Sequence, residues 1–527
     1  MLPDQTSPEM HPQRWGDPAA ATVLPDSALG LVELAFGLQD RPPVRGATPP
    51  PSALDDVLLD ELRDALGADH VLTDDVTRTL RTRGKSTPDL LRARAGDLFD
   101  APDALVRPDG HEDVVAVLAW AVQHRVAVVP FGGGTSVTGG LAARRDGFAG
   151  VVSLDLVRMK RLLAVDEVSM TATLEPGLRG PEAEALLAEH GLTLGHYPQS
   201  FRHASIGGFA ATRSSGQSSA GYGRFDAMVV GLTAATPTGT LRLGSSPANA
   251  AGPDLRQLLL GSEGAFGVIT SVTVRVRRAP AVTSYEGWRW PSFDAGSDAM
   301  RTLAQAGLLP TVLRLSDESE TAINLADPSS IGGAEDPGCL MVAGYEGTEE
   351  QVAARRAAVT AVLAGLGGTA LGTEPGERWA HGRFDGPYLR DALLDHGVLV
   401  ETLETATFWS NRERLYADVK AALTASLGEG SLVLCHVSHV YETGCSLYFT
   451  VAAKQGEEPI EQWWRAKRAA CDTIAAHGAT ISHHHAVGTD HRPWLENEIG
   501  PVGVRILRAV KAELDPTGVL NPGVLIP

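Results

Sequence analysis

A glycine-rich segment carries the residues best suited to bind an anion through the backbone. Residues 130–140 read Pro-Phe-Gly-Gly-Gly-Thr-Ser-Val-Thr-Gly-Gly and follow directly on the apolar run Val126–Val129. Glycine admits positive φ angles and lets an anion approach the main chain, so successive N–H groups can converge on one phosphate. No Gly-Lys-Ser/Thr follows, and the glycines do not open a helix as G-x-G-x-x-G. The spacing therefore predicts a phosphate-binding turn of another kind, with a plain loop turn as the alternative.

A tyrosine and a histidine triplet are the candidate proton-exchanging residues. Tyr448 lies 35 positions before the first residue of His483–His485. A phenol with an ordinary pKa of about 10 needs cations or hydrogen bonds beside it to exchange protons at neutral pH, and imidazoles can supply them. Ile481 and the Ala-Val-Gly of 486–488 flank the triplet, which predicts a partly buried strand-to-turn position. A solvent-exposed triplet is the alternative.

An arginine in an apolar setting is a further candidate. Arg314 lies between Leu313 and Leu315. A buried guanidinium is costly unless it meets an anion, so this position favours an anionic ligand. A structural ion pair with a carboxylate, such as that of Asp317, is the alternative.

Composition limits the classes of protein open to this chain. Its 527 residues are 43% hydrophobic, enough for two or three domains. Acidic residues number 64 against 45 Lys and Arg, a net charge of -19, so we expect no nucleic-acid partner. The four cysteines show no C-x-x-C spacing and no apolar run reaches about 18 residues. These features predict a cytoplasmic protein, with a peripheral membrane contact left open, and the abundance of Ala, Arg and Gly favours a bacterial source.

The spacing of apolar residues predicts an α+β chain. We expect helices over 111–123, 181–190 and about 499–514, with a short helix at 29–38. We expect strands at 126–129, 151–156, 170–174 and 268–276. Changes in character divide the chain into a proline-rich extension over 1–53, a mixed domain over 54–280, a second mixed region over 281–460 and a helical C-terminal segment over 461–527.

Three further segments give the glycine-rich turn a specific meaning. Residues 198–208, 211–217 and 261–270 repeat its glycines and hydroxyl-bearing side chains. In this order and spacing, the four segments resemble the flavin-binding domain of the vanillyl-alcohol-oxidase-type family, which holds the pyrophosphate of FAD on such a loop. The resemblance covers most of the chain, from about residue 14 to the C-terminus. It implies a two-subdomain FAD-binding domain of the PCMH type over 54–280, an α+β cap over 281–460 and a C-terminal segment that closes on the flavin.

The resemblance also implies which residues bind the cofactor. No His or Cys stands in an evident flavin-tethering context, so we expect non-covalent FAD. The implied ligands of FAD are Pro130, Phe131, Gly132, Gly133, Gly134, Thr135, Ser136, Pro198, Gln199, Ser200, Phe201, Arg202, His203, Ala204, Ala211, Thr212, Arg213, Ser214, Glu263, Gly264, Ala265, Phe266, Gly267, Val268 and Ile269.

Within that family, six segments resemble the alkylglycerone-phosphate synthase branch. They are residues 195–200, 221–230, 313–317, 388–391, 445–449 and 482–488. The likeness implies that Tyr448 is the catalytic acid/base and that His483, His484 and His485 surround the flavin and the reacting carbon. It places Arg314 and Arg390 at the active site, with Arg390 as a phosphate or carboxylate ligand. Residues 521–525 take the place of the family's closing tail, in altered sequence.

The likeness implies a transferase of ether lipid synthesis without net redox change. Acyl-dihydroxyacetone phosphate would lose a proton from C1, and its fatty carboxylate would leave. The carbon would stay as an adduct on flavin N5 until a long-chain alcohol replaces the carboxylate. The Leu/Val-rich region 281–460 would wall the tunnel for both chains, and we expect a homodimer.

Two other functions stay open. One is an FAD-dependent oxidoreductase acting on a 2-hydroxy acid or another small alcohol, and the other is a flavin-domain protein without catalysis. His436 and His439 could also join the histidine triplet around zinc or manganese. The FAD-linked 2-hydroxy-acid dehydrogenases resemble this chain in the flavin domain, but they bind metal through His-x-Gly-Asp-Gly-Asn and Glu-His-Gly stretches. Residues 436–441 read His-Val-Ser-His-Val-Tyr here, and His484 replaces the Glu, so we expect no metal.

Overall fold

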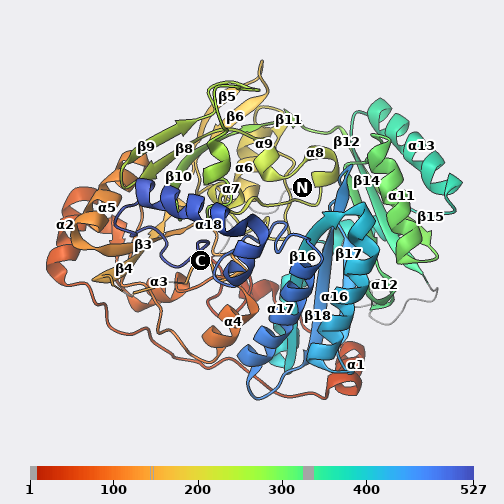
Figure 1. The fold of residues 1–527 in the computed structure, drawn as a ribbon, viewed down its shortest axis with the longest axis horizontal. Coiled ribbons are helices and arrows are strands. Elements are labelled where there is room, and N and C mark those ends of the chain that lie inside the picture. The colour runs from red at the N-terminus through yellow and green to blue at the C-terminus, as the bar shows by residue number, and fades with distance from the viewer. Residues whose placement is uncertain (1–8, 143, 146, 324–337) are drawn as a thin grey trace.

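Two lobes make up the computed structural model, which describes residues 9–142, 144–145, 147–323 and 338–527 (Figure 1). The first lobe carries three sheets and contains the glycine-rich turns. The second lobe is built on one seven-stranded sheet. Among the described residues, no helix is both long and apolar enough to cross a bilayer.

The glycine-rich turn leaves the edge of a small buried sheet. Its strands are, in spatial order, β1 (Val71–Leu72), β2 (Ala104–Val106), β4 (Gly150–Asp155) and β3 (Val126–Phe131). The last three are parallel, and α5 (His111–His124) connects β2 to β3 while α2 (Asp56–Leu66) packs on α5. Val126–Val129 are all buried, as strands of a parallel sheet usually are, so the turn begins from a fixed point.

A second, antiparallel sheet carries the other predicted loops. Its strands are β5 (Leu162–Asp166), β6 (Thr171–Leu174), β10 (Val268–Arg275), β8 (Val229–Thr236) and β9 (Gly239–Leu243), beside the short pair β11 (Arg277–Arg278) and β7 (Leu192–Thr193). The helices here are α6 (Gly180–Ala188), α7 (Ile206–Thr212), α8 (Ser219–Tyr222), α9 (Phe225–Met228) and α10 (Arg256–Leu259). Helix α7 packs on β10 and separates the loop before Ser205 from the loop after Thr212. Both loops are thereby fixed to the sheet.

The second lobe is a seven-stranded antiparallel sheet. Its order is β15 (Thr369–Gly372), β12 (Val282–Trp290), β14 (Cys339–Gly347), β13 (Val312–Ser316), β17 (Leu432–Val437), β18 (Gly444–Lys454) and β16 (Val398–Phe408). One face packs in a common core with α11 (Phe293–Gln305), α13 (Glu349–Gly365), α16 (Arg412–Leu427) and α17 (Pro459–Ala476). On the other side lie α12 (Glu318–Ile323), α14 (Glu374–Gly382) and α15 (Gly386–Asp395).

Strand alternation turns a row of polar side chains away from that core. Leu447 and Phe449 enter the core, so Tyr448 between them faces the opposite side. The register places His436 of β17 and Glu404 of β16 directly beside Tyr448 of β18. We call His436, Tyr448 and Glu404 the polar row.

The chain ends return to the junction of the lobes. The N-terminal α1 (Asp26–Phe36) packs through Val32 and Phe36 on Val398 and Val400 of β16. Helices α3 (Asp75–Leu80) and α4 (Thr87–Arg94) follow, and α4 packs on α17. The final α18 (Leu495–Leu514) is broken at Gly500, and Leu520 beyond it bridges to Val128 of β3.

Most predicted elements are present and the α+β class is confirmed. The helix predicted over 111–123 and the strand over 268–276 appear as α5 and β10, whose bounds differ by one residue. The strand predicted at 481–488 is wrong, because this segment is an irregular loop, but its predicted partial burial is confirmed, since Ile481, His483 and Gly488 are buried and the residues between them are half-buried. The domain bounds after 53, 280 and 460 stay predictions.

Candidate active site

A cavity of about 740 Å³ is lined by both lobes. The glycine-rich turns form one part of its lining, and His436 and Tyr448 of the polar row form another. A third part, which we call the apolar wall, comprises Ala28, Val32, Phe36, Leu393, Val400 and Leu434. The tunnel was predicted to lie within residues 281–460. Helix α1 adds a wall element that sequence reasoning did not anticipate.

Most of the predicted FAD ligands line this cavity. They are Pro130–Ser136, Pro198, Gln199, Ser200, Ala204, Ala211, Thr212, Ser214, Glu263, Gly264, Gly267, Val268 and Ile269. The cavity lining does not include Phe201, Arg202, His203, Arg213, Ala265 and Phe266. Arg213, for example, donates from Nε to the carbonyl of Leu260 at 2.9 Å and ends α7, so it supports the loop from behind.

The turn after β3 is shaped for backbone contacts. A Cβ at Gly133 would lie 2.2 Å from the carbonyl oxygen of His203 and 2.7 Å from Cα of Ala204. Gly134 has a φ of 69°, in the left-handed region. The turn packs so closely against residues 203–204 that a side chain at Gly133 is excluded. Such a turn leaves its backbone N–H groups accessible, as a cradle for a pyrophosphate requires.

Substituting Gly133 with Ala should weaken FAD retention about 10- to 100-fold, because the added methyl displaces the turn or residues 203–204. The flavin absorbance per protein after gel filtration measures this loss. Gly365→Ala is the matched control, since a Cβ there meets nothing within 4 Å. Full flavin content in Gly133→Ala would remove the cradle from the FAD site.

Tyr448 is stacked between two imidazoles. Its ring centroid lies 4.7 Å from that of His436 and 6.1 Å from that of His484, with interplanar angles of 20° and 19°. His485 meets the tyrosine edge-on at 5.6 Å. Burial raises the pKa of Tyr448 to about 12, so the phenol holds its proton at neutral pH. It can donate that proton, or accept one only if a neighbour removes its own.

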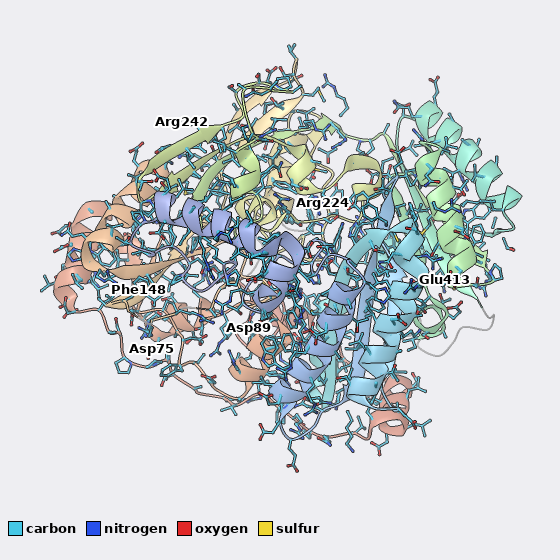
Figure 2. The ribbon with its side chains drawn as sticks, in the orientation of Figure 1. Asp75, Asp89, Phe148, Arg224, Arg242 and Glu413 are labelled. Atoms are coloured by element: carbon cyan, nitrogen blue, oxygen red, sulfur yellow. The ribbon has the colours of Figure 1, made fainter. Side chains whose placement is uncertain are left out.

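The loop 482–488 is held at both ends by buried carboxylates. Glu404 accepts hydrogen bonds from the N–H groups of His484 at 3.0 Å and His485 at 2.9 Å. Glu263, from the first lobe, accepts from the N–H of Val487 at 3.1 Å and of Gly488 at 2.9 Å. Buried N–H groups need such partners, so the loop is stable without strand pairing. Arg224, labelled in Figure 2, adds a bond to the carbonyl of His483 at 2.9 Å.

The imidazoles of the loop are uncharged at neutral pH. Burial lowers the pKa of His485 to about 3 and holds the pKa of His483 well below its usual range. Burial also lowers the pKa of His484, although the charge of Glu404 opposes this shift. A neutral imidazole can accept a proton, so the loop brings proton acceptors beside a protonated phenol.

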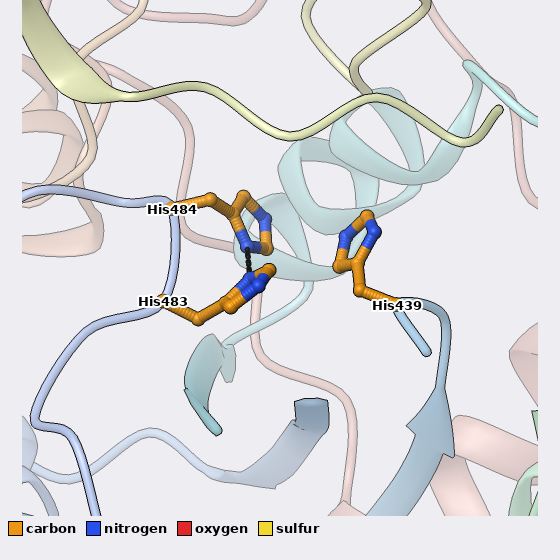
Figure 3. A group of neighbouring side chains, drawn as sticks. All are labelled: His439, His483 and His484. Atoms are coloured by element: carbon orange, nitrogen blue, oxygen red, sulfur yellow. Dashed lines mark hydrogen bonds between the residues drawn. The ribbon is translucent and has the colours of Figure 1, made fainter. Parts of the chain in front are cut away.

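Three imidazoles approach one another closely enough to raise the question of a metal (Figure 3). Nitrogens of His439, His483 and His484 lie within 4.8 Å of one another. However, His483 already pairs through Nε2 with the hydroxyl of Tyr441 at 2.5 Å and through Nδ1 with Nδ1 of His484 at 3.0 Å. His439 Nδ1 accepts from or donates to Ser219 at 2.7 Å. Protein hydrogen bonds thus occupy both nitrogens of His483 and the Nδ1 atoms of His439 and His484, which leaves the Nε2 atoms of His439 and His484 for proton exchange.

Arg314 lines the cavity and pairs with a carboxylate, as the alternative to an anionic ligand predicted, but the partner is Glu320 and not Asp317. Its guanidinium pairs with Glu320 and lies 3.0 Å from Nδ1 of His436. Burial opposes ionisation of Glu320, but His436 and Arg314 lower the pKa of this carboxyl to about 2. The charge of Arg314 is therefore balanced inside the protein, and its catalytic role stays a prediction.

Arg390 presents unsatisfied donors. It lies on α15, lines the cavity and donates from Nη1 to the carbonyl of Lys85 at 2.8 Å. Its Nε and Nη2 are buried without a hydrogen-bond partner, and the nearest carboxylate, Asp391, is 3.6 Å from Nε. Buried guanidinium donors without a hydrogen-bond partner favour the binding of an anionic ligand.

Comparisons with known proteins agree with this geometry. Residues 102–244 match the family described as FAD binding domain, and residues 279–525 match FAD linked oxidases, C-terminal domain. The chain is 35% identical to alkyldihydroxyacetonephosphate synthase of Trypanosoma brucei brucei, over 91% of this chain and 82% of that protein. The chain belongs to the alkyldihydroxyacetonephosphate synthase family. A solved alkyldihydroxyacetonephosphate synthase structure superimposes with a TM-score of 0.83 at 30% identity, covering 98% of each chain.

The wider fold is that of FAD-linked oxidases. A p-cresol methylhydroxylase structure superimposes with a TM-score of 0.70 at 18% identity, covering 89% of this chain and 96% of that one, which shows a shared fold. As a member of the synthase family, the protein is an FAD-dependent enzyme with a PCMH-type flavin domain and a cap.

Sequence reasoning missed several residues that the synthase fold brings to the site. Glu404 and Glu320 are buried carboxylates that organise the histidines and Arg314, and neither was singled out. Two glutamates, Glu401 and Glu404, interrupt the otherwise apolar and Thr-rich strand β16, which was the available signal, although it does not single out Glu404. The equivalence of residues 521–525 to the family's closing tail stays a prediction; in the structure Asn521 donates to the carbonyls of Gly140 and Glu263 at 3.1 and 2.6 Å.

Proposed function

We propose that this enzyme exchanges the acyl chain of acyl-dihydroxyacetone phosphate for a long-chain alcohol, using non-covalent FAD. One observation supports this most directly. A single cavity connects a phosphate-type backbone cradle, a polar site with unsatisfied arginine donors and an apolar wall. A phosphorylated headgroup attached to an aliphatic chain requires both kinds of surface.

FAD would lie along the glycine-rich turns. The cradle at Gly133 and Gly134 would hold its pyrophosphate through N–H groups, and the segments around α7 and Glu263 would flank the nucleotide. When bound, FAD supplies an electron sink beside the reacting carbon. The stacked Phe201 and Phe384 rings, 5.8 Å apart, brace the loop that follows Pro198.

Tyr448 of the polar row and the imidazoles of the loop 482–488 would move the protons of the reaction. Removing a proton from C1 of the substrate needs an acceptor. Of the triplet, His484 and His485 line the cavity and meet Tyr448, so their neutral imidazoles would be the acceptors, whereas both nitrogens of His483 are hydrogen-bonded within the protein. The protonated phenol of Tyr448 supplies a donor for the departing carboxylate. Glu404 and His436 are buried beside this cluster, while Tyr448, His484 and His485 line the cavity where the substrate would bind.

Arg390 would hold the phosphate, and the apolar wall would take the hydrocarbon chains. A guanidinium with two free donors suits bidentate contact with a phosphate. The wall residues from α1, α15, β16 and β17 offer methyl and phenyl surface. We also propose that the enzyme is a homodimer and that it is located in the cytoplasm, in peripheral contact with a membrane.

The test separates this activity from oxidation of a 2-hydroxy acid. Purified holoenzyme is incubated anaerobically with acyl-dihydroxyacetone phosphate and hexadecanol, or with D-lactate or glycolate. We expect fatty-acid release and ether product from the first mixture, with no lasting flavin bleaching from the second, and no change after dialysis against EDTA. Bleaching by a 2-hydroxy acid without fatty-acid release would favour the oxidoreductase instead.

A further inference from the structure

Glu404 is a buried carboxylate with an unusual set of partners. Its side chain is 2% exposed, and Oε1 accepts from the hydroxyl of Ser482 at 2.9 Å. The same oxygen accepts from the backbone N–H groups of His483 at 2.9 Å, His484 at 3.0 Å and His485 at 2.9 Å. Three consecutive N–H groups thus converge on one side chain.

This convergence sets the directions of the histidine side chains. Consecutive N–H groups can share one acceptor only if the backbone curls around it. The three side chains then leave the backbone in different directions. Accordingly, His483 stacks on His439 at 4.9 Å, His484 stacks on Tyr448 at 6.1 Å, and His485 meets Tyr448 edge-on. Glu404 itself lies beside Tyr448 in the sheet register, so one residue ties the loop to the polar row.

Glu404 also places a negative charge next to neutral imidazoles. Its Oε2 lies 3.6 Å from Nδ1 of His484, and Oε1 lies 4.0 Å from Nδ1 of His485. The other titratable or charged groups that interact with Glu404 or with these imidazoles are His439, Tyr441 and Tyr448 of the β17–β18 region, Arg224 before α9, Lys467 and Cys471 of α17, His491 after the loop and His196 after β7. Arg224 is bonded to Asp226, and Lys467 to His491, at 2.6 and 2.5 Å. Glu404 is therefore the carboxylate best placed to balance a proton on His484.

We propose that Glu404 is a positioning residue that aims the histidine triplet through three backbone N–H groups and supplies the counter-charge for a proton on His484 during turnover. The second part rests on the proposed function. The proton moves from the substrate to an imidazole and is returned when the exchange is complete, so no other reactant is needed.

The experiment compares three variants of the FAD-loaded full chain. Glu404→Gln keeps the volume and removes the charge, while Glu404→Asp keeps the charge on a shorter arm. Glu286→Gln is the matched control, a buried cap-domain carboxylate that bonds Trp288 and Tyr345 outside the cavity. Deuterium exchange of the peptide over 482–488 reports positioning without relying on activity. The pH dependence of kcat for alkyl exchange reports the charge.

The expected outcomes follow from these contacts. Amides of 483–485 should exchange at least about tenfold faster in both Glu404 variants, and at the wild-type rate in Glu286→Gln. Without the carboxylate, the pKa of the accepting imidazole falls, so the acidic limb of the kcat profile should move about one pH unit or more lower in Glu404→Gln. The weaker base should also reduce kcat about 100-fold, with KM changed less than threefold.

Two results would overturn the proposal. Wild-type exchange rates over 482–488 in both Glu404 variants would remove the positioning role, and an unshifted limb in Glu404→Gln with a reduced kcat would remove the counter-charge role. Absence of alkyl exchange in the wild type would instead contradict the proposed function, and the deuterium-exchange comparison would still decide whether Glu404 positions the loop.

Discussion

Tyr448→Phe is expected to lower the rate of alkyl-for-acyl exchange by about 10³-fold while FAD stays bound. The substitution removes the hydroxyl alone, so the ring remains stacked between His436 and His484 and the cavity keeps its shape. Positioned acid–base groups contribute about 10²- to 10⁴-fold to rates, which sets the size of the loss. Incorporation of labelled hexadecanol measures the activity, and the flavin absorbance measures the cofactor.

Burial of Tyr448 also predicts the form of the pH profile. Because its pKa lies near 12, the phenol is protonated throughout pH 6 to 10 and should contribute no limb there. A rate that rises through pH 6 to 10 in the wild type and becomes flat in Tyr448→Phe would show that the phenolate is the working form. Tyr345→Phe is the control, since this buried tyrosine bonds Glu286 at 2.8 Å outside the cavity. It should cost about 1 kcal/mol of stability and leave the exchange rate unchanged.

The flavin half of the site was predictable because its signal is local. A cradle made of backbone N–H groups needs glycines at consecutive positions, and the clash that a Cβ at Gly133 would cause shows why no other residue can stand there. Tyr448 was found through resemblance, and strand alternation between Leu447 and Phe449 explains why it faces the cavity.

The partners of these residues could not be predicted, because they depend on contacts between distant segments. Glu404 lies about 80 positions before the loop that it holds and has no motif of its own. Asp317, three residues after Arg314, was the example given for a carboxylate partner of Arg314. Strand β13 ends at Ser316, however, and α12 turns Glu320 back toward Arg314. Asp317 is bonded instead to Tyr416 and Lys420, each at 2.9 Å.

The proline-rich extension shows a similar limit. The sequence predicted only a proline-rich extension over 1–53 with a short helix at 29–38, and gave it no place in the site. In the structure α1 lines the cavity, and Trp15 packs edge-on against His203 with ring centroids 5.9 Å apart. The apolar face of α1 packs on β16, which lies more than 360 residues later in the chain, so its role could not be predicted from the local sequence.

Arg390→Lys is expected to raise KM for acyl-dihydroxyacetone phosphate about 10- to 100-fold. Arg390 donates from Nη1 to the carbonyl of Lys85, while Nε and Nη2 have no hydrogen-bond partner and could bind the ligand. A lysine has one nitrogen and cannot satisfy Lys85 and grip a phosphate as a fork at once, although the positive charge remains. Losing one charge-assisted hydrogen bond costs about 1.5–3 kcal/mol, which corresponds to that range of affinity.

Inorganic phosphate as a competitive inhibitor separates headgroup binding from chain binding. If Arg390 holds the phosphate, the inhibition constant should rise in Arg390→Lys by the same factor as KM, while KM for hexadecanol stays near the wild-type value. Arg412→Lys serves as control, because Arg412 is a buried arginine paired with Asp294 at 2.5 Å and does not line the cavity. Equal phosphate inhibition in Arg390→Lys and the wild type would mean that the free donors of Arg390 face another group, and the headgroup would then have to be held by the flavin-side turns.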